Sequence, residues 1–233
     1  MTSSLEEVKA QMASADPGKR MAALVALRFF SDEEAVPLLF QAALDPIPLV
    51  RVYAAIGLGK KKGEGNFDLL IDLLNNDKDA SVRAEAAGSL GSLGDLRAVE
   101  YLLRAYYEDI DWIVRYSAVV SLGQLRDERG YPVLRNAVAS DTDMIRDAAI
   151  SALGELGNAR ALDVLLPLVP NPDPEVRRRI AQALGLIALQ ARETNAQEPS
   201  RAPLAYLAKD DDEKVVEFAR YYLEQLDGTA PRE

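Results

Sequence analysis

One ten-residue phrase recurs five times along this chain, and its spacing constrains the fold more than any other feature. The copies are VRVYAAIGLG from Val50, VRAEAAGSLG from Val82, VRYSAVVSLG from Val114, IRDAAISALG from Ile145 and VRRRIAQALG from Val176. Their arginines lie 32, 32, 31 and 31 residues apart. A fixed period of this length is typical of helix pairs stacked in a row, in which each pair buries its apolar face against its neighbours.

The apolar spacing inside each copy is helical. Val114, Ala118 and Leu122 recur at i, i+4 and i+8. The preceding segment has Val99, Leu102, Leu103 and Tyr106 at i, i+3, i+4 and i+7. Weaker copies precede and follow the five strong ones. We therefore predict an all-α fold, a right-handed α-solenoid of about seven helix pairs that forms a single array over 1–233. The expected pairs span about 4–29, 32–60, 66–93, 96–125, 128–156, 159–190 and 201–227.

The period is interrupted once, near the C-terminus. The last copy places Glu217 at the arginine position, 40 residues after Arg177. The residues by which this unit exceeds the usual period are polar and contain two prolines. Residues 191–200 are therefore expected to form an insertion, with an extended helix end and a surface loop.

The recurring residues have structural explanations. The valine before each arginine, the alanine three positions after it and the leucine seven positions after it form the expected buried stripe. Glycine then follows at Gly59, Gly91, Gly123, Gly154 and Gly185. Glycine inside a helix costs about 1 kcal/mol relative to alanine. Its repetition therefore predicts that a neighbouring helix approaches closely at each of these positions.

Aspartate stands six positions before the repeated arginine in the first copies. The positions hold Asp45, Asp77 and Asp109, then Ser140, Asn171 and Asp211. Such side chains can cap the following helix, and a carboxylate can accept the two-pronged guanidinium of an arginine. Asp-x-Asp pairs in these turns also suit a divalent cation, but a calcium loop would need a glycine and a distal glutamate, so we interpret them as caps.

With its Leu-Gly ending, this aspartate–arginine spacing resembles the HEAT repeat proteins. The phrases LGDLRAVEYLL and LGNARALDVLL are similar to those of the phycobilisome lyase group of HEAT-like proteins from cyanobacteria. The resemblance implies a ladder of aspartate–arginine pairs that links successive repeats. The residues expected in this structural ladder are Asp45, Arg51, Asp77, Arg83, Asp109, Arg115, Arg146 and Arg177.

Composition excludes several kinds of chemistry. The chain has neither cysteine nor histidine, which removes thiolate nucleophiles, serine–histidine triads and the commonest metal ligands. Its net charge of −10 opposes binding to nucleic acid. No apolar run approaches a membrane span, and the N-terminus lacks the pattern of a signal peptide, so we expect a cytoplasmic protein.

A partner is expected on the second helices of the pairs, which line the concave face in HEAT-like stacks. Positions one, two, five and six after each arginine should lie on this face, and in the first half they are small or apolar. Trp112 stands where other copies carry lysine, aspartate or proline, which indicates an exposed site. The candidate partner-binding residues are Val52, Tyr53, Ile56, Trp112, Tyr116 and Val120. Packing between repeats is the alternative explanation for these aromatic residues.

Two kinds of function fit this interpretation. The first is a protein-binding scaffold, adaptor or chaperone whose groove holds a partner such as a phycobiliprotein subunit or a second HEAT-repeat chain. This function needs no catalytic residue, metal or cofactor, apart from a transient bilin. The alternative that the resemblance implies is a phycobilin lyase or chromophore-detaching enzyme. A second alternative is an adaptor for an iron–sulfur assembly protein.

Overall fold

The apolar stripe of the repeat forms the core of the protein. The computed structural model describes residues 4–193 and 200–228. In each strong copy the three stripe positions are fully or almost fully buried, as the period predicts. They are Val50, Ala54, Leu58, Val82, Ala86, Leu90, Val114, Ala118, Leu122, Ile145, Ala149, Leu153, Val176, Ile180 and Leu184.

The chain divides into two compact units, and the first comprises residues 1–121. Ser4 caps the first helix through the reciprocal hydrogen bonds with Glu7 that its sequence predicts. The helices of this unit are α1 Leu5–Met12, α2 Pro17–Ala26, η1 Leu27–Phe29, α3 Asp32–Ala42, α4 Pro48–Lys60, α5 Asn66–Asn76, α6 Ala80–Leu93, α7 Ala98–Glu108 and α8 Trp112–Leu125, whose last residues belong to the second unit.

The second unit comprises residues 122–233. Its helices are η2 Glu128–Gly130, α9 Tyr131–Ala137, α10 Asp143–Leu156, η3 Ala159–Ala161, α11 Leu162–Leu165, η4 Leu166–Leu168, α12 Pro174–Glu193, α13 Arg201–Leu207 and α14 Glu213–Asp227. Pro167 lacks a backbone N–H, and the α-helical segment gives way to a 3₁₀ turn beside it. The expected insertion at 191–200 begins with the end of α12, and its residues 194–199 lie outside the described residues.

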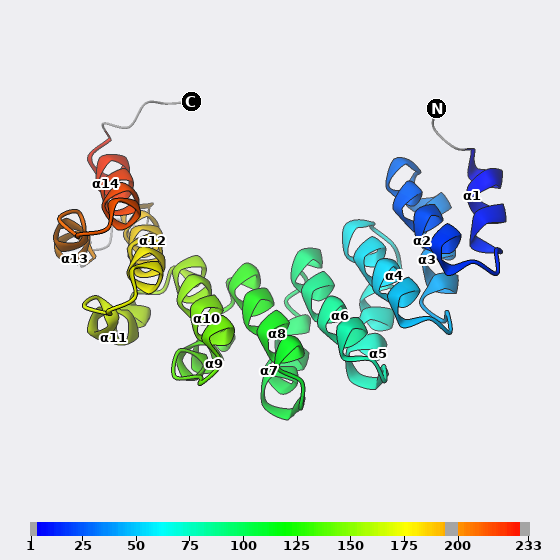
Figure 1. The fold of residues 1–233 in the computed structure, drawn as a ribbon, viewed down its shortest axis with the longest axis horizontal. Coiled ribbons are helices and arrows are strands. Elements are labelled where there is room, and N and C mark those ends of the chain that lie inside the picture. The colour runs from blue at the N-terminus through cyan, green and yellow to red at the C-terminus, as the bar shows by residue number, and fades with distance from the viewer. Residues whose placement is uncertain (1–3, 194–199, 229–233) are drawn as a thin grey trace. The chain divides into compact units, whose positions relative to one another are not determined.

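The helices pair as the period predicts, and within the described ranges they form seven pairs with no strand. In each unit the first helix of a pair packs on the second, as α5 does on α6 and α13 does on α14 (Figure 1). The second helices also stack on one another, α2 on α4 and α4 on α6 in the first unit, and α10 on α12 and α12 on α14 in the second. None of the described helices is both long and apolar enough to cross a membrane.

Close approach of successive second helices explains the repeated glycines. A Cβ atom added at Gly59 would lie 2.9 Å from the Cα of Ser89. One added at Gly154 would lie 2.5 Å from the Cα of Ala183. Ser89 is itself buried, and its hydroxyl donates a hydrogen bond to the carbonyl oxygen of Ala55 at 2.8 Å. The glycine therefore makes room for the next helix.

The same contact corrects one prediction about the partner-facing surface. The repeat pattern places Ser89 and Ser121, six positions after their arginines, on the open face. Both are buried, because each hydroxyl donates to a carbonyl of the preceding second helix, Ser121 to Ala87 at 2.9 Å. The sixth position therefore lies between helices.

A ladder of aspartate–arginine pairs joins successive repeats within each unit. In four pairs among the described residues, an arginine reaches forward to the aspartate of the next repeat and donates two hydrogen bonds to its carboxylate. The pairs are Arg20–Asp45 at 2.6 and 2.9 Å, Arg51–Asp77 at 2.7 and 2.7 Å, Arg83–Asp109 at 2.7 and 2.9 Å, and Arg177–Asp210 at 2.8 and 2.8 Å. The remaining nitrogen donates to a carbonyl of the arginine's own turn, as Arg51 does to Asp45 at 2.8 Å. One guanidinium thus ties two turns together.

Two ladder arginines have other partners. Arg115 donates to the carbonyl oxygen of Asp109 at 3.5 Å, and the next aspartate position holds Ser140. Arg146 pairs with Asp143 of its own helix at 2.9 Å, since the next aspartate position holds Asn171. Neither serine nor asparagine carries the negative charge that would attract an arginine side chain.

The register of the last repeat differs from the prediction by one residue. Asp210, not Asp211, accepts the hydrogen bonds of Arg177, and Val215 is the fully buried residue that corresponds to Val176. Val216 therefore holds the arginine position that the sequence pattern assigned to Glu217. Two adjacent valines made both registers compatible with the apolar pattern, and burial selects the earlier one.

Substitution of Gly154 by alanine tests the close approach. We expect the Gly154→Ala protein to lose about 1–3 kcal/mol of unfolding free energy, because the backbone of α12 blocks the added methyl group. Gly88→Ala is the matched control, since a Cβ there meets nothing within 4 Å. It should gain up to about 1 kcal/mol. Equal changes in unfolding free energy for the two variants, measured by urea denaturation, would contradict the steric explanation.

Substitution of Arg51 by alanine tests the ladder. It leaves the carboxylate of Asp77 largely buried without its main partner, so the unfolding free energy should fall by about 2–4 kcal/mol. Arg115→Ala is the comparison, because Ser140 stands where the aspartate partner of Arg115 would be. This substitution should lower the unfolding free energy by less than about 1 kcal/mol. Similar losses in the two proteins would show that the arginine stem, not the ion pair, stabilises the array.

The ladder also predicts how stability depends on pH. Burial raises the pKa of Asp77, but the hydrogen bonds from Arg51 and from the backbone of Asp79 outweigh it and lower the pKa below its usual value. A lowered folded-state pKa gives stability that is present above the unfolded-state pKa of about 3.9 and is lost as the pH falls through the folded-state value. Urea titrations should show stability falling below about pH 4, with a shallower slope in Asp77→Asn.

Candidate binding site

A hollow in the first unit contains two of the predicted partner-binding residues. It has a volume of about 250 Å³ and lies among α2, η1, α3 and α4. Its lining consists of Leu24, Val25, Leu27, Arg28, Leu39, Tyr53, Ile56, Gly57, Lys60 and Lys61. Tyr53 and Ile56 are both half-buried on α4.

The floor of the hollow is apolar and depends on a glycine. Leu24, Leu27 and Leu39 are buried. A Cβ atom at Gly57 would lie 2.3 Å from a methyl carbon of Leu39, so the glycine allows Leu39 to pack directly on the backbone of α4. Val25 remains 43% exposed at the rim.

Three cations surround this apolar floor. Lys61 donates to the carbonyl oxygen of Phe30 at 2.5 Å and lies 3.5 Å from a carboxylate oxygen of Asp32. Arg28 is exposed, and its guanidinium lies 4.4 Å from the ring centre of Phe29. Lys60 is exposed at the end of α4. The hollow therefore suits an apolar group that carries negative charge.

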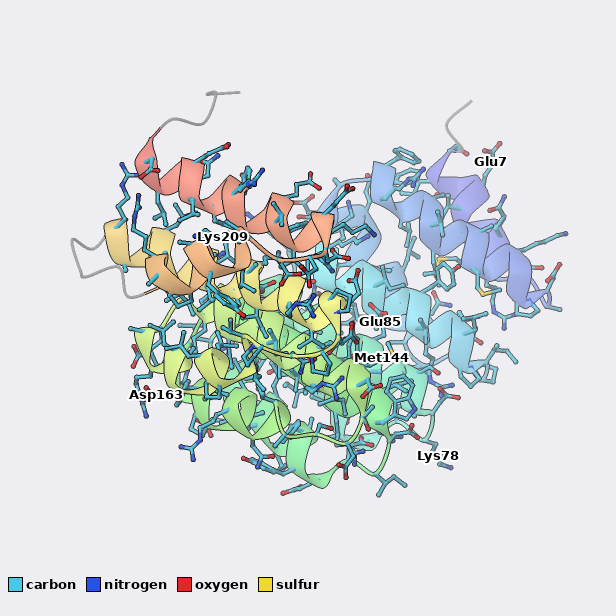
Figure 2. All side chains as sticks on the ribbon, turned by 60° about the vertical axis from the view of Figure 1, so that its left-hand side comes forward. Glu7, Lys78, Glu85, Met144, Asp163 and Lys209 are labelled. Atoms are coloured by element: carbon cyan, nitrogen blue, oxygen red, sulfur yellow. The ribbon has the colours of Figure 1, made fainter. Side chains whose placement is uncertain are left out.

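The positive charge of this rim affects a carboxylate of the next repeat. Glu85, labelled in Figure 2, is half-buried on α6. Burial raises its pKa above the usual value, and the charge of Lys60 partly opposes the shift. Lys60 thus lies close enough to α6 to influence a group on the neighbouring second helix.

The structure separates the remaining predicted partner residues from this hollow. Val52 is half-buried on α4 outside the lining. Trp112 is 42% exposed at the start of α8, as its variable position in the repeat predicts, while Tyr116 and Val120 are half-buried further along that helix. Sequence reasoning missed Arg28 and Lys60 as site residues, although the run Lys60-Lys61-Lys62 directly after a repeat glycine was a visible signal.

The aspartate pairs of the turns serve the backbone. Asp77 accepts from Arg51 and from the N–H of Asp79, and Asp79 in turn caps α6 through the N–H of Ser81. Among the described residues no group of three acidic side chains is placed to hold a metal ion. Capping and the ladder together account for these Asp-x-Asp turns.

A model of HEAT repeats matches residues 5–87, 67–153 and 140–224, which together cover most of the sequence. The chain belongs to the HEAT-repeat family. It is 40% identical over 151 residues to the phycocyanobilin lyase subunit alpha of Pseudanabaena tenuis strain PCC 7409. That match covers 58% of this HEAT-repeat protein and 56% of the relative, so the chain spans little more than half of the curated relative it matches.

Solved HEAT-type structures share the fold. The complex of CpcE and CpcF of phycocyanin lyase from Nostoc sp. PCC7120 contains a chain with a TM-score of 0.62 and 23% identity, covering 82% of this protein and 76% of that chain. A chain in the structure of Kap95p with RanGDP gives a TM-score of 0.70 at 14% identity, covering 97% of this protein and 36% of that chain. At such identities these likenesses describe the fold alone.

Removal of the charge of Lys60 tests the electrostatics of the hollow. We expect Lys60→Met to raise the pKa of Glu85 further, because the opposing positive charge is lost. Carboxyl-resolved NMR titration measures this pKa directly. Lys78→Met, which removes a lysine from the turn before α6, is the control and should leave it unchanged. An unchanged Glu85 pKa in Lys60→Met would place Lys60 away from α6.

Proposed function

We propose that this HEAT-repeat protein is a protein-binding scaffold or chaperone in the processing of phycobiliproteins. In this proposal the hollow lined by Tyr53 and Ile56, called the α4 hollow below, binds a side chain of the partner. The observation that carries the proposal is an apolar hollow with a cationic rim on the second helices. The name of the relative from Pseudanabaena tenuis supports the biological setting, because that protein is a subunit of a phycocyanobilin lyase.

The size of the hollow favours a protein partner over an enclosed pigment. Pockets that enclose drug-sized ligands measure about 300–1,000 Å³, and the hollow measures about 250 Å³. An open-chain tetrapyrrole has four rings and two propionates, so the hollow would enclose only part of it. Buried apolar anchors surrounded by charged residues are typical of protein interfaces. The hollow therefore fits an apolar side chain that is flanked by acidic residues.

The candidate partners are a phycobiliprotein subunit and a second HEAT-repeat chain. The second possibility draws support from the complex of CpcE and CpcF, because a chain in that complex shares the fold of this protein. We favour the phycobiliprotein subunit, because a scaffold that acts in pigment processing must contact the protein that carries the pigment. The comparisons reported above give the iron–sulfur adaptor function no support, and we do not propose it.

Lyase or chromophore-detaching activity is the alternative function. The relative's name favours it, and Tyr53 with the neighbouring cations offers a phenol and positive charges for the propionates of a transiently bound bilin. With neither cysteine nor histidine, the chain itself supplies neither a thiolate nor an imidazole for covalent or acid–base steps. This composition favours the scaffold function.

A binding measurement with defined variants tests the scaffold. We expect an immobilised pigment-free phycocyanin subunit to capture the wild-type protein, and Tyr53→Ala or Ile56→Asp to weaken the affinity about tenfold or more. Trp112→Ala tests whether the interface extends to α8. Tyr206→Ala removes an exposed tyrosine on α13 and is the matched control. All variants must keep the wild-type melting temperature.

A spectral measurement separates the two functions. Addition of phycocyanobilin to the purified protein should leave the pigment's absorbance and fluorescence nearly unchanged if the protein is a scaffold. A protein-dependent spectral shift that Tyr53→Ala abolishes would favour the lyase alternative. Unaltered capture of the subunit by both Tyr53→Ala and Ile56→Asp would contradict the role of the hollow.

A further inference from the structure

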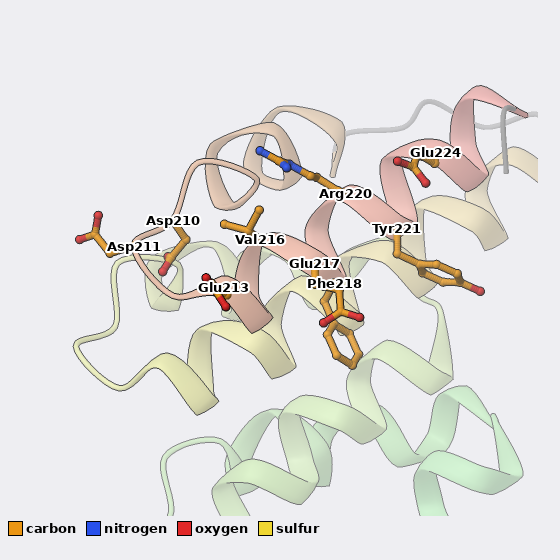
Figure 3. A pocket seen from close by; sticks show the side chains of 9 residues that line it. All are labelled: Asp210, Asp211, Glu213, Val216, Glu217, Phe218, Arg220, Tyr221 and Glu224. Carbon is orange, nitrogen blue, oxygen red and sulfur yellow. The ribbon is translucent and has the colours of Figure 1, made fainter.

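The last helix carries a second concave surface, of opposite charge to the hollow. A groove of about 790 Å³ is formed by α14 and the turn before it (Figure 3). Its lining consists of Asp210, Asp211, Glu213, Val216, Glu217, Phe218, Arg220, Tyr221 and Glu224. Five carboxylates and one arginine thus surround three apolar side chains.

The groove lies on the face of α14 that points away from the core. Val215, Ala219, Tyr222 and Leu226 are buried at i, i+4, i+7 and i+11. The lining residues of the helix occupy the positions between them, on the opposite side. Tyr221 is 53% exposed there, and Phe218 is half-buried with its ring 5.0 Å from the guanidinium carbon of Arg178. Val216 and Glu224 occupy the positions that in an inner repeat would contact the next repeat.

The groove lacks both features that join one repeat to the next. Val216 stands at the ladder position, where inner repeats have arginine. Glu224 stands eight residues later, where inner repeats have the glycine that allows close approach. A further HEAT helix, including the first repeat of a second copy, would find neither the ion pair nor the space that the inner repeats provide. The groove is therefore built for a different occupant.

The charge of the lining specifies that occupant. Asp210 is neutralised by Arg177, while Asp211, Glu213 and Glu217 are exposed. Carboxylates repel phosphate and attract lysine and arginine. Phe218 and Tyr221 lie three residues apart and are therefore neighbours on the surface of α14. Such an apolar pair beside carboxylates suits an amphipathic helix laid along it.

We propose that the outer face of α14 binds a basic amphipathic helix of a partner protein. The apolar face of that helix packs on Phe218 and Tyr221, and its lysine or arginine side chains meet Glu213 and Glu217. This inference does not rest on the proposed function of the α4 hollow, because the two surfaces belong to different units and have opposite charge.

A defined peptide tests the proposal on the full-length protein. The probe is a labelled leucine–lysine helix roughly 18 residues long, or five turns, with leucines at i, i+3, i+4 and i+7. One control peptide has the same composition with the leucines distributed around the helix, and another replaces lysine by glutamate. We expect fluorescence anisotropy to report binding of the first peptide only, with an affinity that falls as salt is added.

Charge-matched variants locate the binding surface. Glu217→Lys and Tyr221→Ala should each weaken binding about tenfold or more. Asp163→Lys makes the same change of charge on α11, at a site labelled in Figure 2, and should bind like the wild type. Because Glu217 and Tyr221 are exposed, both variants are expected to fold, and circular dichroism checks this.

Three results would overturn the proposal. The first is undiminished binding of the leucine–lysine helix to the Glu217→Lys protein. The second is equal binding of the scrambled peptide, which would reduce the effect to unspecific charge attraction. The third is self-association of the wild-type protein in light scattering that Tyr221→Ala abolishes, which would assign the groove to a second copy of this chain.

Discussion

The structure of each unit depends on the way in which one helix pair is fixed to the next. The bidentate arginine–aspartate pair supplies the directional part of this contact, because its guanidinium bonds a carboxylate of the next turn and a carbonyl of its own. The apolar stripe and the missing side chain at the repeat glycine supply the close contact. Packing brings the helices together, and the two-pronged ion pair adds a directional constraint on their register.

Changes in this contact mark the places where the protein departs from a uniform array. Ser140 and Asn171 interrupt the ladder, and it resumes between Arg177 and Asp210. At the last helix, valine and glutamate replace the arginine and the glycine, so this face no longer accepts another repeat. This face is also grooved and carries five carboxylates.

The two surfaces described above illustrate how one repeat can carry different chemistry. In the first unit, Gly57 and Leu39 create an apolar floor, and the lysines after α4 give it a positive rim. In the second unit, α14 carries apolar side chains among carboxylates. In both places the buried stripe is retained and only the side chains that face away from it change. Function in such a fold follows from these outward positions, because the core positions are already committed to stacking.

The helix pairs, the buried stripe and the close approach at the glycines follow from the repeat period, and the partial exposure of Trp112 follows from comparing one position across the copies. The apolar pattern leaves open which of two adjacent valines is buried in the last repeat. It also leaves open whether Ser89 and Ser121 turn inward. The α4 hollow brings Arg28 of η1 together with Tyr53 and Lys60 of α4, and the α14 groove combines side chains of that helix with Asp210 and Asp211 of the turn before it. These features emerge in the folded protein, because they depend on how separate segments pack against one another.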